Sequence, residues 1–429
     1  MISNRIAAIL AARGIHYGWL VAAATFLAML ATAGAMGSAG VLILPLEQEF
    51  GWSTAEISLA MAIRLMLFGL LGPFAAALMN YFGVRVVTAT ALAITASGIF
   101  LSLFMTEVWQ LVALWGVVIG VGTGMTALVL GATVAVRWFD KRRGLIVGLM
   151  TASNATGQLV FLPLLASVTE AVGWRSALTV VIAALAAVLT LVLLVMRDRP
   201  ADVGLPPFGG TAIVPAPPRG ALSSLVTAPL RALRTASRVP VFWVLFLTFF
   251  VCGFSTNGLI QTHWIALCGD YGMAAVTAAG MLAVVGLFDM AGTIGSGWLS
   301  DRFDNRWLLF WFYGLRGLSL IFLPFSDFSF YALSLFAVVY GLDWVATVPP
   351  TVKLSAENFG PELAAIVFGW IFTGHQLGAA SAAFLAGLAR STFDTYLPAL
   401  VGAGGLCILA ALLILTVDRK PAGRLVPAG

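Results

Sequence analysis

Charged residues are scarce in this sequence. Only 10% of its 429 residues are Asp, Glu, Lys or Arg, whereas 61% are hydrophobic and the mean hydropathy is +1.01. A soluble protein of this length carries about a quarter charged residues, because its surface must face water. The scarcity excludes an ordinary soluble fold and indicates that most of the surface faces lipid.

Metal ligands and nucleophiles are also few. The sequence has three histidines and three cysteines, and Cys252, Cys268 and Cys407 lie in or at the ends of apolar stretches without metal-ligand spacing. Such cysteines are typical small apolar residues of a core. We therefore expect no metal and no cofactor, and this composition argues against a membrane-embedded enzyme.

The apolar residues form twelve segments long enough to cross a bilayer. About 20 residues at 1.5 Å each span about 30 Å of hydrocarbon, and backbone groups in lipid must be paired within helices. Pro45, Pro163, Pro349 and Pro350 are expected to kink or end their helices. The predicted fold is an all-α membrane protein with twelve transmembrane helices, at residues 18–45, 54–79, 84–105, 108–136, 144–168, 174–196, 241–268, 274–299, 307–325, 328–352, 361–389 and 396–417.

The net charge of +5 comes from basic residues that gather on one side of these segments. With the N-terminus inside, nineteen of the 23 Lys and Arg residues lie in inside loops, and the outside loops hold only Arg175 and Arg390. Positive loops mark the cytoplasmic side of a membrane. We expect a multi-pass protein of the inner (plasma) membrane with both termini cytoplasmic, and the basic composition requires no nucleic-acid partner.

One long proline-rich break, residues 197–240, divides the chain into residues 1–196 and 241–429. Within it, residues 222–238 form either an amphipathic helix on the membrane surface or part of a solvated linker. When Asn80 is aligned with Asp301, Gly120 also falls on Gly341. Such a repeat predicts two pseudo-symmetric six-helix bundles with a binding site between them near the midplane.

A loop motif in each half resembles that of the major facilitator superfamily. Residues 297–306, Gly-Trp-Leu-Ser-Asp-Arg-Phe-Asp-Asn-Arg, resemble the loop between the second and third helices of each half in that family, and residues 80–85 are a degenerate counterpart with Asn80 in place of Asp. The resemblance covers nearly the whole chain. It implies the major facilitator fold and a loop that locks helix ends together in one conformation. The candidate residues of this motif are Asn80, Gly83, Arg85, Gly297, Asp301, Arg302 and Arg306.

A narrower resemblance is to monocarboxylate porters and oxalate–formate antiporters. Residues 138–152 are similar to the fifth-helix signature of these porters, and Phe288-Asp289-Met290 resembles their eighth-helix segment. The Arg that those porters carry one turn after the Asp is Thr293 here, and the first helix has no Lys. The resemblance implies a small organic anion such as a monocarboxylate, and the two departures mean that the substrate cannot be copied from that branch.

Four charged residues lie deep in predicted spans: Arg64, Asp289, Arg316 and Asp343. A charge at the bilayer centre costs about 2.5–3.5 kcal/mol on insertion scales, so each one requires a physical reason. Counting from loop charges places the last three about 15–18 Å deep, near the midplane. Either Asp289 or Asp343 titrates as a proton-coupling site beside Arg316, or the three form an ion-pair network that fixes helix packing.

Other polar residues are candidates for substrate binding. Arg64 has no carboxylate at its depth in its own half, so it either binds an anionic substrate or pairs with Asp289 across the interface. His375 aligns with Asn154, and both positions line the cavity in the family; the alternative for His375 is a satisfied core histidine. Gln261 and His263, near the outer end of the seventh predicted span, are further candidates. The complete set is Arg64, Asn154, Gln261, His263 and His375.

These observations predict a secondary active transporter that works by alternating access. We expect a small organic anion as substrate, protons or another ion as the coupling partner, and a monomer in the bilayer. Two alternatives stay open at this point. One is an efflux carrier for a drug-like or metabolite molecule, and the other is a membrane sensor or receptor that binds its ligand without transporting it.

Overall fold

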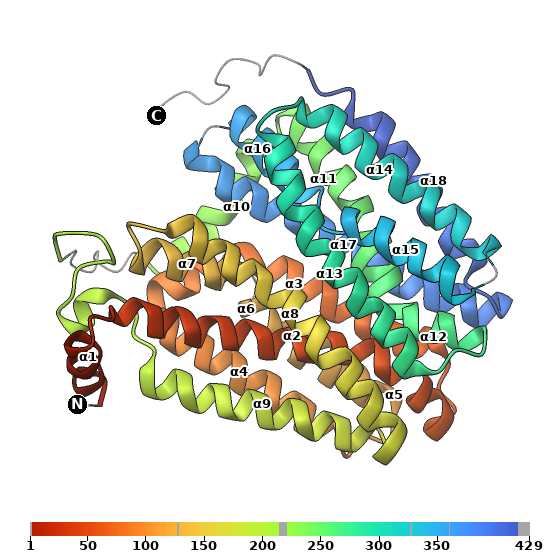
Figure 1. The fold of residues 1–429 in the computed structure, drawn as a ribbon, viewed down its shortest axis with the longest axis horizontal. Coiled ribbons are helices and arrows are strands. Elements are labelled where there is room, and N and C mark those ends of the chain that lie inside the picture. The colour runs from red at the N-terminus through yellow and green to blue at the C-terminus, as the bar shows by residue number, and fades with distance from the viewer. Residues whose placement is uncertain (1, 127, 214–220, 327, 360, 419–429) are drawn as a thin grey trace.

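The computed structural model describes residues 2–126, 128–213, 221–326, 328–359 and 361–418. Nearly all of these residues are helical (Figure 1). The elements before the proline-rich break are α1 (Ile2–Ala12), α2 (Tyr17–Phe50), α3 (Thr54–Phe82), α4 (Val84–Ser102), α5 (Val108–Leu111), η1 (Val112–Val118), α6 (Ile119–Met125), α7 (Leu128–Trp138), α8 (Arg143–Val172) and α9 (Trp174–Val195).

The remaining elements lie within the break or after it. They are η2 (Pro200–Val203), α10 (Ser224–Ala236), α11 (Pro240–Gly253), η3 (Phe254–Gln261), α12 (Thr262–Asp270), α13 (Ala275–Ser300), α14 (Asn305–Phe322), η4 (Leu323–Phe325), α15 (Phe330–Asp343), α16 (Val348–Phe359), α17 (Pro361–Phe393) and α18 (Leu397–Ile414).

Within the described residues, ten helical stretches are long and apolar enough to cross a membrane. Four of them combine consecutive elements, at residues 108–138, 240–270, 305–325 and 330–359. Helices α8 and α17 have 30 and 33 residues, and both exceed the roughly 20 residues that a bilayer requires. The predicted all-α membrane fold is confirmed, and the expected number of twelve spans is consistent with this arrangement.

The helices form two bundles. In Figure 1 the helices coloured red to yellow, α2 to α9, lie on one side, and the green to blue helices, α11 to α18, lie on the other. The bundles meet where α3 packs against α17 and where α8 packs against α13. The domain boundaries at residues 196 and 240 stay a prediction.

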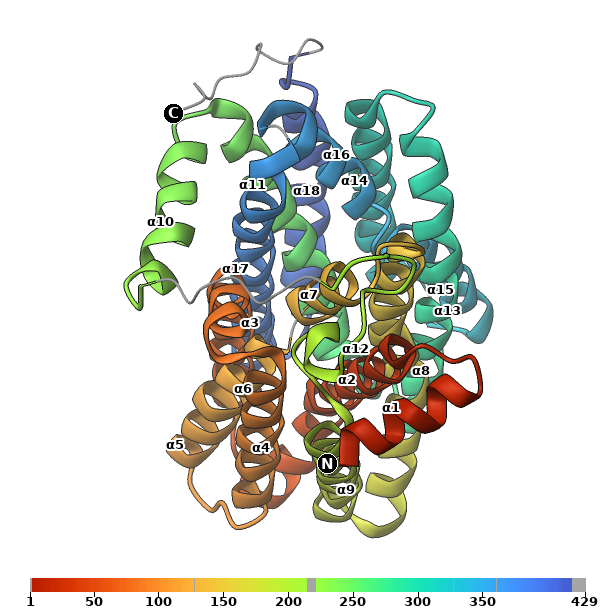
Figure 2. The same ribbon diagram turned by 90° about the vertical axis from the view of Figure 1, so that its left-hand side faces the viewer.

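The two ends of the molecule differ. Helices α1 and α10 lie at the end that Figure 2 turns toward the viewer, which we call the terminal face. The opposite end, where α2 reaches Phe50 and α17 reaches Phe393, is called the far face.

Local sequence signals explain several helix ends. Ser53 begins α3 with a capping box, in which its hydroxyl accepts from the Glu56 backbone N–H and the Glu56 carboxylate accepts from the Ser53 N–H. Gly51, which ends α2, has φ +69°, a left-handed conformation that glycine adopts at no steric cost. These caps place a tight turn between α2 and α3 at the far face.

The span at residues 330–359 is interrupted between α15 and α16. Pro349 and Pro350 have no N–H, so they cannot donate helical hydrogen bonds to the carbonyls of Val345 and Ala346. The Ala346 carbonyl instead accepts from the Ser296 hydroxyl of α13 at 2.5 Å. The sequence therefore breaks this helix at mid-length, where a neighbouring helix pairs the released backbone group.

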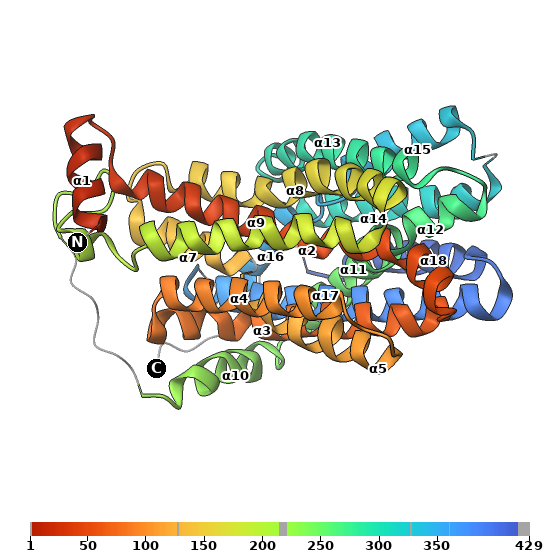
Figure 3. The same ribbon diagram turned by 90° about the horizontal axis from the view of Figure 1, so that it is seen from below.

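The segment predicted as either an amphipathic helix or a linker contains a helix, α10, which packs on α3 and α17 (Figure 3). Ala232 and Ala236 are buried, whereas Val226 and Leu230, four residues apart, are exposed. The Trp370 indole of α17 donates to the Pro229 carbonyl at 2.9 Å. The N-terminal helix α1 was not expected from the sequence.

Candidate functional site

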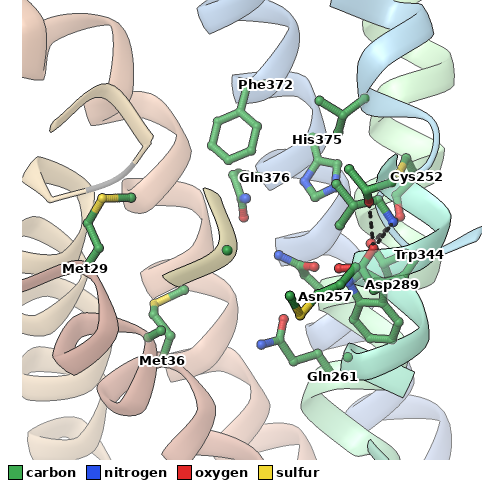
Figure 4. A pocket seen from close by; sticks show the side chains of 18 of the residues that line it. Met29, Met36, Cys252, Asn257, Gln261, Asp289, Trp344, Phe372, His375 and Gln376 are labelled. Carbon is green, nitrogen blue, oxygen red and sulfur yellow. Dashed lines mark hydrogen bonds between the residues drawn. The ribbon is translucent and has the colours of Figure 1, made fainter. Parts of the chain in front are cut away.

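A cavity of about 600 Å³ lies between the two bundles (Figure 4). Helices α2, α3 and α8 contribute to one wall, and the elements α11, η3, α13 and α17 contribute to the other. Binding sites for small molecules are typically clefts of about 300–1,000 Å³. The size and the position between the bundles make this cavity the candidate site.

The cavity opens toward the terminal face. Leu145 at the start of α8 and Ile294 near the end of α13 both line it, and Ile294 is 74% exposed. At the far face the same two helices approach each other, and the Val276 N–H donates to the Glu170 carboxylate at 3.2 Å. Helices α8 and α13 therefore meet at the far face and diverge toward the terminal face.

Asp289 is near the middle of α13 and lines the cavity. Its Oδ1 accepts from the Thr293 hydroxyl at 3.0 Å and from the Val345 N–H at 2.9 Å. The second bond is available because Val345 lies in the break between α15 and α16. The other oxygen, Oδ2, has no hydrogen bond from the described residues and remains available to a solute or a proton.

Asp343 and Arg316 lie behind this wall and are not among the lining residues. Arg316 Nε donates to Asp343 Oδ2 at 2.6 Å, and its Nη2 donates to the carbonyls of Asp343 at 2.5 Å and Trp344 at 3.1 Å. These carbonyls end α15, so Arg316 caps the broken helix. Its Nη1 also lies 3.0 Å from the Sγ of Cys252, a cavity-lining residue. This geometry matches the ion-pair alternative for these two residues.

Several polar groups of the cavity wall have no hydrogen-bond partner among the described residues. The side chains of Asn257 and Gln261 belong to the π-helical turn η3 and make no such bond. His375 Nδ1 and Gln376 Oε1, both on α17, are buried and unpaired. Buried polar groups are nearly always paired, and π-helical turns occur frequently at functional sites. The unpaired groups therefore indicate a surface that binds a polar part of a solute.

The described lining of the first bundle is mainly apolar. Its lining residues include Met29, Met36 and Phe68, and Figure 4 shows Met29 and Met36 facing the polar wall across the cavity. Two threonines, Thr32 and Thr126, belong to this described lining, and their hydroxyl oxygens share a hydrogen bond at 3.1 Å. The described lining is therefore mainly apolar on the side of the first bundle and carries unpaired polar groups on the side of the second.

Two predicted substrate-binding residues, Arg64 and His263, lie away from the cavity. Arg64 is 2% exposed, lies over the Trp115 ring and donates from Nη1 to the Ala35 carbonyl at 3.3 Å. His263 is paired at both ring nitrogens, at 3.0 Å with a tyrosine hydroxyl and at 2.8 Å with a backbone carbonyl. The side chain of Asn154 lies outside the described residues. The candidates that do line the cavity are Gln261 and His375.

The first-half loop motif binds residues of its own half and of the start of the proline-rich break. Arg137 donates to the Asn80 side chain at 2.6 Å. Gly83 has φ +91°, and a Cβ there would meet the Asp198 carboxylate, which accepts from the Arg85 N–H at 2.9 Å. Glycine at this position therefore satisfies both the backbone conformation and the close approach.

The second-half motif also binds within its own half. Its contacts are an ion pair of Asp301 with Lys353 at 3.2 Å, an ion pair of Arg306 with Asp304 at 2.6 Å, and Arg302 over the Trp298 ring. Gly297 has open space where a Cβ would lie. In this conformation no described contact of either motif reaches the other bundle, and the predicted locking role remains a prediction.

Sequence reasoning did not select Arg390, which joins the bundles at the far face. Arg390 of α17 donates from Nη1 to the Glu47 carboxylate of α2 at 2.7 and 2.9 Å and to the Thr54 hydroxyl at 2.6 Å. Its Nη2 and Nε bind Asp270. We call these four residues the far-face clamp. The signal in the sequence was that Arg390 is one of only two basic residues in the outside loops.

Two helical bundles around a central cavity point to a transporter, and the family comparison decides which kind. A family model described as Major Facilitator Superfamily matches residues 21–383 and, in a second match, residues 297–429. The chain belongs to the Major Facilitator Superfamily. It is therefore a multi-pass membrane protein of a family of transporters, which in general are not enzymes.

Individual relatives agree with this assignment. The chain is 26% identical over 418 residues to an uncharacterised MFS-type transporter, YcxA, of Bacillus subtilis, covering 95% of each chain. It is 25% identical over 414 residues to monocarboxylate transporter 13 of Bos taurus, covering 94% of this chain and 90% of that one. The crystal structure of a D-xylose–proton symporter matches with a TM-score of 0.73 at 14% identity, covering 93% of this chain and 98% of that chain.

The resemblance seen in the sequence is thus confirmed for this superfamily, and the relatives include monocarboxylate transporters. The likeness to the symporter structure supports the fold alone, because the identity is low. Membership of a transporter family implies a small-molecule substrate and a lipid bilayer around the helices.

Proposed function

We propose that the chain is a secondary active transporter that moves a small organic molecule by alternating access and is coupled to protons. The observation that carries this proposal is the cavity between the bundles, which is open toward the terminal face and closed at the far face by the far-face clamp. An alternating carrier presents its central site to one side of the membrane at a time.

Asp289 is the proposed coupling site. Its Oδ1 is held by Thr293 and Val345, and its Oδ2 has no partner among the described residues. A carboxylate in a membrane span that faces a cavity can exchange a proton with the solvent on the open side. Asp343 differs, because Arg316 holds it behind the wall, and we assign that pair a structural role.

Two substrate classes have support. An organic anion, such as a monocarboxylate, is supported by the names of the relatives. It is also supported by the resemblance of residues 138–152 and 288–290 to segments of the monocarboxylate porters. The efflux-type alternative, a drug-like or metabolite molecule, is supported by the apolar wall of the cavity. The roles of Arg64, Asn154 and His263 in binding remain predictions.

The basic loops support a cytoplasmic location for the terminal face, in the inner (plasma) membrane. On this proposal the cavity is open to the cytoplasm, and both termini lie there. We further propose that the protein acts as a monomer without a nucleic-acid partner, because one chain contributes both walls of the cavity.

Flux measurements in proteoliposomes test the proposal. Vesicles loaded with a pH-sensitive dye receive an external pulse of lactate, phenylbutyrate or phenylbutylamine, and empty vesicles correct for passive permeation. A carrier that moves a proton with an anion acidifies the interior, and one that exchanges a cation for a proton makes it alkaline. We expect at least one probe to change the internal pH several times faster than in empty vesicles.

Asp289→Asn is expected to abolish this proton flux, because the amide cannot take up a proton near neutral pH. Asp394→Asn is the matched control, since Asp394 is exposed at the far face and has φ +53°, which asparagine also tolerates. Wild-type protein that binds a probe but shows no flux would favour the sensor alternative. An unchanged proton flux in Asp289→Asn would disprove the coupling role.

A further inference from the structure

Among the residues that the structure describes, the cavity lining has a carboxylate but no cationic side chain to match it. Among its described lining residues Asp289 is the one Asp or Glu, and no Lys or Arg is present. Two buried guanidinium groups lie elsewhere: Arg316 binds Asp343 and two backbone carbonyls, and Arg64 lies over Trp115 in the first bundle. The formal charge of the described lining is therefore negative.

This charge discriminates between solutes. A solute carboxylate that enters the cavity loses hydration, finds no cationic partner on the described walls and meets the like charge of Asp289. A solute ammonium group loses hydration too, but it gains a charge-assisted hydrogen bond to Asp289 Oδ2. Because a buried charge requires a partner, the described lining favours a cation.

The groups near Asp289 suit an ammonium ion. The side-chain carbonyls of Asn257 and Gln261 are available acceptors, and Figure 4 shows both residues on the same side of the cavity as Asp289. The rings of Trp344 and Phe372 also line the cavity. Aromatic faces attract cations through their quadrupole, most strongly where water is excluded.

The opposite wall suits an apolar body. Met29, Met36 and Phe68 present thioether and aromatic surface that requires no hydrogen-bond partner. Methionine side chains adapt to ligands of different shape, because they are unbranched and polarisable. A solute with one charged end and one apolar end can therefore contact both walls at once.

We infer that the cavity binds amphipathic organic cations, with the ammonium group at Asp289 and the apolar body against Met29, Met36 and Phe68. This inference rests on the proposed function and narrows its substrate to one chemical class. It departs from the monocarboxylate expected from the relatives, because Thr293 occupies the position where the porters carry an Arg and bonds Asp289 instead.

Equilibrium binding to the purified protein in lipid nanodiscs tests the inference. Three probes share one apolar body and differ in the polar end: phenylbutylamine, phenylbutanol and phenylbutyrate. At neutral pH we expect the amine to bind at least tenfold more tightly than the acid, with the alcohol between them. Equal affinity of the acid and the amine, or tighter binding of the acid, would overturn the inference.

Variants locate the ammonium group. Asp289→Asn is expected to lower the affinity for the amine at least tenfold, to that of the alcohol. The affinity for the alcohol should stay within about twofold of its wild-type value. Asp289→Glu should recover part of the amine affinity, whereas the exposed control Asp394→Asn should match wild type for all three probes. If Asp289→Asn binds the amine as tightly as wild type does, the ammonium group does not sit at Asp289 and the inference is wrong.

The pH dependence of amine affinity is a further test. The affinity would not change with pH if Asp289 had only a structural role. Protonation of Asp289 removes its charge, so amine affinity should fall as the pH is lowered, while alcohol affinity stays constant. Among the described residues, the other titratable or charged groups around this site are Cys252, Arg316, Asp343 and His375. Protonation of His375 would also weaken the binding of a cation. The titration is therefore repeated in His375→Gln, in which the amine affinity should still fall as the pH is lowered.

The binding and flux experiments can fail separately. Amine binding without proton-coupled flux would contradict the proposed transporter and leave the inference intact. Flux of lactate or phenylbutyrate together with weak amine binding would support the transporter and overturn the inference.

Discussion

Asp289 and Asp343 are two aspartates at similar depth that lie in different environments. Asp289 has one oxygen fixed by Thr293 and Val345, and it lines the cavity with its other oxygen unpaired among the described residues. Asp343 is engaged by Arg316, whose guanidinium also caps the end of α15. Asp289 therefore presents an oxygen to the cavity, whereas Asp343 is bonded to Arg316 at the end of the broken helix.

This difference predicts unequal effects on stability. Asp343→Asn leaves the buried guanidinium of Arg316 without its counter-charge, so we expect it to destabilise the protein by about 3–5 kcal/mol. Asp289→Asn retains an oxygen that can accept from Val345 and should cost less than about 1 kcal/mol. Thermal unfolding of the detergent-solubilised protein compares the two variants.

A double variant checks that the pair itself is responsible. Replacing both partners, in Arg316→Met with Asp343→Leu, removes both charges and should recover part of the lost stability. A double variant that is less stable than either single variant would show that the hydrogen bonds of Arg316 to the α15 carbonyls dominate instead.

The depth of these residues in the membrane could be predicted from the sequence, but the direction in which each side chain faces could not. The count of residues from loop charges placed Asp289, Arg316 and Asp343 at one level, and Arg316 and Asp343 are indeed in contact. Whether a side chain faces the cavity or the interior of a bundle depends on the rotation of its helix. That rotation is set by packing against neighbouring helices, which is why Arg64 could be assigned to a span but not to one face of it.

At the scale of elements, glycines decide how closely helices approach. A Cβ added at Gly292 of α13 would meet the backbone carbonyl of Leu342 in α15. Gly292 lies one turn from Asp289, so this contact fixes the distance between α13 and the end of α15. Small residues at such crossings are the usual way in which transmembrane helices pack tightly.

Gly292→Ala is therefore expected to push α13 away from α15 and to lower stability by about 1–3 kcal/mol, since a carbonyl cannot yield as a flexible side chain does. Gly280→Ala in the same helix is the matched control, because a Cβ there meets nothing within 4 Å. The control should be neutral or slightly stabilising, as alanine favours helix. Equal melting temperatures for the two variants would contradict the assigned contact.

Most elements could be predicted from apolar runs, because the bilayer forces each run into a helix of known minimum length. The prolines at 349 and 350 also signalled the interruption of the tenth predicted span. The π-helical turn η3 had no such signal, because residues 254–261, Phe-Ser-Thr-Asn-Gly-Leu-Ile-Gln, are compatible with ordinary helix. Asn257 was consequently missed, although Gln261 was selected.

At the scale of the whole molecule, the far-face clamp joins the two bundles at the end opposite the opening of the cavity. Arg390 binds Glu47 of the first bundle, and it binds Asp270 of the second bundle to which it belongs. These three residues are far apart in the chain, and no periodicity links them, so a single sequence could not bring them together. The two basic residues of the outside loops were the available signal, and each of them pairs with a carboxylate at the end of α2.

The far face must open and close if the protein alternates between two states, and a reversible bond across it tests this directly. The Ala55 N–H of α3 donates to the Ser391 hydroxyl of α17 at 3.1 Å. With standard bond lengths the two Cα atoms are then at most about 7 Å apart, within the range that a disulfide can bridge. Ala55→Cys with Ser391→Cys should therefore form a disulfide on oxidation, because Ser391 is exposed and Ala55 is partly exposed.

The oxidised double variant should lose roughly nine-tenths or more of its flux and recover it on reduction, because the bond holds the far face shut. Phenylbutylamine should still bind with wild-type affinity, since the cavity stays open toward the terminal face. Each single-cysteine variant should transport normally under oxidant, which excludes damage to Cys252, Cys268 or Cys407. Undiminished flux in fully cross-linked protein would mean that this face does not open during transport, and alternating access between the two bundles would be the wrong mechanism.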